Sequence, residues 1–456
     1  MVVYKCLLNI RFLFFLLWWI FLLAAGAAGQ TGDTFNDNAS LDQCLGYALK
    51  HQPVVAQSAI REKVAKNNTG AALSGWLPQV DVSANYQHYL LQPVSIFPDF
   101  SNPEGPKREV TTGVVNTSAI QLNASQNIFD PDLVIAGRAS GLYNRQAKQS
   151  TKQNLIELVV NVSKAFYDVL LAKARLDFYL EDRTRLEKSL QDARSLFENG
   201  LNDKIDFQRA QIALNNVDAE IAGTREEIRV KNTVLKQLMG YPLSMPLTIT
   251  MDSSKLQQTT FLDTSLTTSH RNRVEYQLQE TSIRLQQAEV TRQRMQFLPS
   301  LSAYANYNLV YQNDNLNALY DRDFPNSSAG LRLSLPLFSG GQRMFRIKAA
   351  KLHLEDMKLD SVNLGNRIRT EFETAMASYK SNMKTLEAAR QNVILADGIY
   401  NTVRLQYNQG IKSFLEVIVS EADLRSARIN ELNALYRLIT SRIDVDAAVG
   451  NISTNY

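Results

Sequence analysis

Two kinds of hydrophobic periodicity alternate along the chain. In four segments, apolar and polar residues alternate one by one, which predicts strands with one apolar and one polar face. These segments lie at about residues 78–91, 117–129, 299–311 and 328–338. Strands of this length, with Asn, Ser and Gln on the polar face, suit the wall of a transmembrane β-barrel, which has lipid outside and water inside. A water-soluble β-sandwich is the alternative that the strands leave open.

Between the strands, apolar residues recur every seven positions instead. From Leu155 to Phe197 only Arg183 interrupts one such row. A sustained period of 3.5 residues predicts helices that wind around their neighbours as coiled coils. The predicted helices cover about residues 132–198, 203–239, 342–408 and 413–449. A helix over 132–198 would be roughly 100 Å long, far longer than a bilayer is thick.

The chain is a tandem repeat. Residues 77–86 (LPQVDVSANY) match 298–307 (LPSLSAYANY), and residues 119–129 match 329–338. Each repeat reads as helix, strand, loop, strand, long helix, tight turn and returning helix. The predicted divisions are an N-terminal segment 30–39, repeat one 40–240, a linker 241–260, repeat two 261–450 and a tail 451–456.

Residues 1–29 have the layout of a secretory signal peptide. Lys5 and Arg11 precede the apolar run 12–23, and small residues follow it. The run is too short to span a bilayer comfortably, which disfavours a membrane anchor, the alternative interpretation. Without Lys5 and Arg11 the formal charge falls from +4 to +2, too balanced to suggest a nucleic-acid partner.

The sequence offers no recognisable catalytic or metal chemistry. The four histidines are dispersed, and none has metal-ligand spacing with another histidine, a cysteine or an acid. We find no nucleophile paired with a base. We therefore expect no enzyme, no cofactor and no metal site.

Two repeats provide four strands, too few for one chain to close a barrel. The smallest transmembrane barrels have about eight strands, and an open edge cannot face hydrocarbon because its amides would be unpaired. Several copies must therefore share one barrel, although periodicity does not choose among dimer, trimer and tetramer. Residues 91–116 and 308–328 would be loops outside the barrel.

Two turns in the helical part share one pattern: an aromatic residue, a glycine three positions later and an acid six positions after that. The members are Phe197, Gly200 and Asp206 in the first turn, and Tyr407, Gly410 and Glu416 in the second. Glycine ends a helix in left-handed geometry without steric cost. Asp203 and Ser413 follow at the positions that cap a returning helix, and Ser413 with Glu416 matches a capping box.

With its duplicated strand segments and its two aromatic-x-x-Gly turns, the chain resembles the TolC-like outer-membrane efflux proteins over about residues 40–450. The resemblance implies an α+β membrane protein. Three copies would share one 12-stranded β-barrel in the outer membrane, in contact with its lipid, and a 12-helix α-barrel would continue it into the periplasm. The assembly would be a passive exit duct for small molecules, coupled to an inner-membrane transporter through a periplasmic adaptor protein.

The resemblance also implies a gate at the two turns. The positions that match the family's bonded groups are Asp206, Tyr407 and Lys412. Glu416 matches the first of two acids that line the constriction, and Val419 stands in place of the second. The predicted adaptor contacts are the hairpin tips Gly200, Leu201, Gly410 and Ile411.

Three alternatives remain open at this point. Asp206 and Glu416 could only cap helices, with Tyr407 only filling the coiled-coil seam. The duct could serve type I protein secretion instead of small-molecule efflux. In a different class, the chain could be a secreted coiled-coil scaffold.

Overall fold

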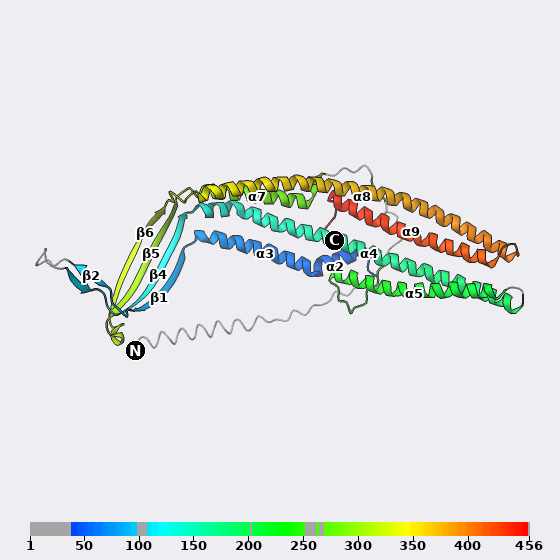
Figure 1. The fold of residues 1–456 in the computed structure, drawn as a ribbon, viewed down its shortest axis with the longest axis horizontal. Helices are drawn as coiled ribbons and strands as arrows, with labels where there is room; N and C mark the ends of the chain where they lie inside the picture. Colours follow the sequence, from blue (N-terminus) through cyan, green and yellow to red (C-terminus); the bar gives the residue numbers. More distant parts are fainter. Residues whose placement is uncertain (1–37, 98–106, 201–202, 251–260, 264–268, 455–456) are drawn as a thin grey trace.

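The computed structural model describes residues 38–97, 107–200, 203–250, 261–263 and 269–454. The predicted signal peptide, Leu201 and residues 251–260 of the predicted linker lie outside these ranges. The described part is elongated, with a sheet at one end and two helical turns at the other (Figure 1).

One antiparallel sheet combines two strands from each repeat. It consists of β1 (Gln79–His88), β4 (Asn116–Phe129), β5 (Ser300–Asn313) and β6 (Asp323–Ser334), in the order β1-β4-β5-β6. The register places Val82 opposite Leu122 and Leu122 opposite Tyr307. One residue away, Asp81 lies opposite Asn123, and Asn123 opposite Asn306. Because side chains alternate between faces, the pairing gives the sheet one apolar face and one polar face.

Two connections lie at the end of the sheet away from the helices, one from β1 to β4 and one from β5 to β6, and they differ in length (Figure 1). The first carries a small hairpin of β2 (Val94–Phe97) and β3 (Arg108–Thr111). The second is shorter than the predicted loop 308–328, because β5 continues to Asn313 and β6 already begins at Asp323. Pro325 lies within β6, opposite Leu309. An edge strand tolerates proline because one of its sides needs no N–H partner, so the predicted start at residue 328 was wrong.

Long helices carry the chain away from the sheet and back. α4 (Pro131–Glu198) and α8 (Gln342–Asn408) lead away, and α5 (Lys204–Met239) and α9 (Phe414–Val449) return (Figure 1). Shorter elements complete the helical part: α2 (Leu41–His51), α3 (Pro53–Leu73), α7 (Val274–Met295) and the 3₁₀ turns Ser74–Trp76 and His270–Asn272. A third 3₁₀ turn, Leu316–Ala318, lies in the connection between β5 and β6. Among the described residues, no helix is both long and apolar enough to cross a bilayer.

The helical core follows the seams inside each hairpin. Between α4 and α5, the fully buried Leu186 belongs to one apolar cluster with Leu214 and Val217. Arg183, which interrupts the seven-residue row, forms an ion pair with Asp218 across the same seam at 2.7 Å. A separate cluster joins α8 to α9, so each hairpin has its own apolar seam. The largest cluster joins α2, α4, α5 and the segment after α5 to Ile439 of α9.

Candidate functional site

Both helical hairpins turn at the end of the molecule farthest from the sheet (Figure 1). Gly200 and Gly410 follow the ends of α4 and α8 with φ values of 70° and 74°. This left-handed geometry favours glycine, and an added Cβ at either position would meet nothing within 4 Å. Ile411, next to Gly410, is 66% exposed. The described residues of both tips therefore offer an accessible surface.

At the first tip, two aspartates flank the start of α5. The Asp203 carboxylate accepts a hydrogen bond from the Ile205 N–H at 3.2 Å and so caps the helix. Asp206 is half-buried one turn later. Burial raises the pKa of the Asp206 carboxyl, the Asp203 charge adds to this, and Arg209 opposes it. Asp206 therefore binds a proton more readily than an exposed aspartate does.

At the second tip, Glu416 is held by its own turn. The N–H and hydroxyl of Ser413 donate to its carboxylate at 3.0 and 3.1 Å, and the Lys412 Nζ lies 2.6 Å from its other oxygen. The hydrogen bond from Lys412, followed by that from the Ser413 backbone, lowers the pKa of Glu416. The carboxylate thus stays ionised, and Lys412 balances part of its charge.

Tyr407 links the second hairpin to the first. Its ring packs against Phe414 with the centroids 5.6 Å apart. Both rings belong to one cluster with Ala193 of α4 and Ala210 of α5. Asp206 lies one helical turn before Ala210. The structure therefore gathers Asp206, Tyr407, Lys412 and Glu416 at one end of the molecule, and it bonds two of them directly to each other.

A buried charge cluster between α4 and α9 escaped the sequence analysis. Asp182 is 0% exposed and Glu421 is 1% exposed. Arg425 and Arg185 both donate to the Asp182 carboxylate, Arg185 at 2.8 Å. The cluster was missed because its residues flank the seven-residue apolar rows rather than occupy them. The available signal was a pair of acids, each followed by an arginine three or four positions later on helices from different repeats.

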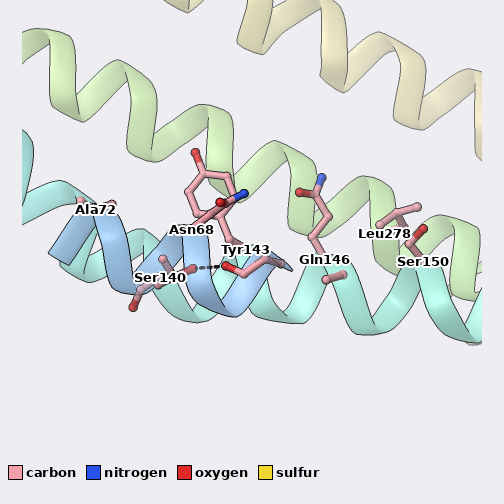
Figure 2. Close-up of a pocket in the computed structure, with 11 residues that line it drawn as sticks. Asn68, Ala72, Ser140, Tyr143, Gln146, Ser150 and Leu278 are labelled. Carbon is pink, nitrogen blue, oxygen red and sulfur yellow. Dashed lines mark hydrogen bonds between the residues drawn. The ribbon is translucent and has the colours of Figure 1, made fainter. Parts of the chain in front are cut away.

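A groove of about 650 Å³ lies between α3 and α4, near Leu278 of α7 (Figure 2). Small and polar side chains such as Asn68, Ser140 and Gln146 line it, and no lining residue that the structure describes is charged. The described residues also contain no group of three or more His, Cys, Asp or Glu that could hold a metal ion. The hairpin tips therefore remain the candidate site.

Comparison with known proteins identifies the family. The model of the outer membrane efflux protein family matches residues 44–241 and 270–451. The chain belongs to this family. Its two matched segments each contain two strands of the sheet and one helical hairpin. As an outer membrane efflux protein, it resides in the outer membrane and extends into the periplasm.

Relatives and solved structures agree with this assignment. Outer membrane protein TolC of Vibrio cholerae is 20% identical over 420 residues, which cover 91% of each chain. Alkaline protease secretion protein AprF of Pseudomonas aeruginosa is 23% identical over 338 residues, 70% of this chain and 67% of AprF. A crystal structure of CusC superposes with a TM-score of 0.73 at 17% identity, covering 91% of this chain and 95% of CusC. This likeness confirms the tandem-repeat α+β channel fold.

Proposed function

We propose that the protein is the exit duct of a tripartite efflux system, a passive conduit that carries small molecules across the periplasm and the outer membrane. The observation that carries the proposal is the sheet, which has one apolar face, one polar face and two edge strands. It stands at the end of α4, whose 68 residues reach roughly 100 Å, enough to lead from the membrane deep into the periplasm. Family membership does not favour the secreted-scaffold alternative.

In this proposal three copies close one barrel of twelve strands. β6 of one copy would pair with β1 of the next, which satisfies the edge amides that hydrocarbon cannot. Leu331 on β6 and Val82 on β1 are 68% and 67% exposed in the single chain. Lipid contact accounts for apolar side chains of this exposure on both edge strands. The hairpin tips would then meet the periplasmic adaptor, which couples the duct to an inner-membrane transporter.

Membrane fractionation tests this proposal. The chain should stay with outer membranes after a carbonate wash, because an apolar barrel wall is held by lipid rather than by charge. It should be extracted by detergent as a trimer, as measured by light scattering. A peripheral membrane protein from the same cells, released by the wash, is the control. Recovery of a monomer that is soluble without detergent would contradict the proposal.

We further propose that Asp206, Tyr407, Lys412 and Glu416 form the gate at the periplasmic end of the duct. The combined variant Asp206→Asn, Tyr407→Phe and Lys412→Gln should raise single-channel conductance in planar bilayers several-fold. These changes remove charges and a hydroxyl at the constriction while leaving the Ser413–Glu416 bonds of the turn in place. Glu416 itself would favour cations at the narrowest point.

The matched control changes exposed charges in the same two hairpins but away from the turns, in the variant Lys188→Gln on α4 and Asp423→Asn on α9. It should conduct as the unmodified protein does. Equal conductance of the gate variant, the control and the unmodified protein would leave helix capping and seam packing as the whole role of these residues.

A further inference from the structure

The two hairpins meet along α4 and α9, where apolar residues such as Ile439 of α9 pack against the α4 core and a column of charged and polar pairs runs beside them. Lys164 forms an ion pair with Asp444, and Arg175 donates to Asn433 at 3.3 Å. Arg425 and Asp182 form the next pair toward the tips. Residue numbers rise along α4 as they fall along α9, so the two helices run antiparallel. Separating a polar pair and hydrating its two groups has a small net cost, whereas exposing an apolar seam to water costs more. Hydration of these pairs offsets part of the cost of opening the contact, so the column marks the part of the seam that can separate most readily.

The pair nearest the tips is the most buried part of this column. Arg425 and Arg185 satisfy Asp182, but both carboxylate oxygens of Glu421 are buried without a hydrogen-bond partner among the described residues. The nearest cation is the Arg185 Nε, 3.9 Å from Glu421 Oε1. The groups that face Glu421 are Asp182 and Arg185 of α4, Tyr400 and Arg404 of α8, and Arg425 of its own helix.

An ionised carboxylate without hydrogen bonds is costly in such a place, and a protonated one costs much less. Burial, followed by the Asp182 charge, raises the pKa of Glu421 to about 7, and the arginines oppose this. If the seam separates and water enters, the pKa of Glu421 returns toward 4.5, the ordinary value of a glutamate. The closed seam thus binds the proton more tightly. The stability that this proton adds to the closed seam is complete below the pKa of the hydrated carboxyl and is lost as the pH rises through about 7.

We propose that Asp182, Arg185, Glu421 and Arg425 form a proton-responsive latch between the two hairpins. Acid keeps the seam closed, and deprotonation of Glu421 at neutral to alkaline pH favours its separation. The proposal builds on the proposed duct in one respect, which is that a shift of the hairpins changes the opening at the tips. The latch itself is a property of the contact between α4 and α9.

Distances between spin labels on the two hairpins test the latch. Lys188→Cys on α4 and Ser426→Cys on α9 place labels at exposed positions, and the native Cys44 is fully buried and does not compete. In detergent-solubilised trimer, the ratio of close to separated populations should fall roughly 10- to 30-fold between pH 5.5 and pH 8. Glu421→Gln, which is neutral at every pH, should abolish this change and keep the close population. Asp423→Asn removes an exposed carboxyl two residues along α9 and should retain the change.

Two results would overturn the latch: a distance distribution that ignores pH in the unmodified protein, or the same pH response in Glu421→Gln. Circular dichroism verifies that each variant is folded. Asp182→Asn provides an independent test. Removing the Asp182 charge should move the midpoint of the pH-dependent distance change to lower pH. A midpoint that does not move counts against the latch. Conductance is recorded on the same samples. Its absence at every pH contradicts the duct, while the distances still decide the latch.

Discussion

Gly240→Ala is expected to lower the free energy of unfolding of the helical part by about 3 kcal/mol. Gly240 ends α5 with a φ of 70°, and an added Cβ would lie 2.9 Å from both the Gln52 Cα and the His51 carbonyl oxygen. These are backbone atoms, so no side chain can turn aside. The substitution therefore adds a steric clash to the strain of left-handed geometry. Denaturant unfolding in detergent, followed by circular dichroism, measures the loss.

Two other glycines provide a graded control. At Gly450, with φ 84°, an added Cβ would lie 3.3 Å from the Asn272 carbonyl oxygen, a tighter contact than usual but not a clash. At Gly410, with φ 74°, it would meet open space. Gly410→Ala should therefore cost only the conformational strain, about 1 kcal/mol. Gly450→Ala should fall between the other two. Equal losses at all three positions would show that backbone strain alone matters and that the approach of Gln52 to Gly240 does not.

Arg425→Met is expected to destabilise the packing of the two hairpins by about 3 kcal/mol at pH 8, because removing one member of a buried pair leaves its partner uncompensated. Asp182 would keep only Arg185, and Glu421 would lose one of the cations that oppose its raised pKa. The loss should be smaller at pH 5.5, since Glu421 then accepts a proton. Denaturant unfolding at the two pH values measures the difference.

The double variant Asp182→Leu with Arg425→Met distinguishes the loss of the ion pair from the cost of leaving a buried charge unpaired. Replacing both members of a buried pair by apolar residues is often neutral, so the double variant should recover part of the stability. Arg194→Met is the control, because its pair with Glu198 is solvent-exposed, at 65% and 60% for the two side chains. Exposed pairs contribute less than about 1 kcal/mol. A double variant less stable than Arg425→Met alone would contradict this account of the cluster.

Periodic features of this fold were readable from the sequence. The seven-residue row that starts at Leu155 includes Val162 and Val169 of α4, and both are buried. The alternation around Val82 and Asp81 assigns them to opposite faces, and the strand register keeps that division across the sheet. The two turn glycines have the positive φ that their place after a helix indicates. Periodicity and turn chemistry are local, so the sequence carries them without reference to a partner segment.

Features that depend on two distant segments were not readable. β6 includes Asp323 and Pro325 because β5 lies beside it and pairs with them, although their composition predicts a loop. In the same way, the link from Tyr407 to the first hairpin appears only when the four helix ends are brought together.

The sequence by itself determined the repeat, the type of each long element, the faces of the strands and the position of the turns, because each follows from spacing along the chain. Only the tertiary structure decided which helices meet between the hairpins. Burial depends on that packing. In the sequence, Asp182 and Glu421 look like surface acids, and they become buried neighbours because α4 packs against α9. Because this packing excludes water, it also changes how readily the Glu421 carboxyl binds a proton.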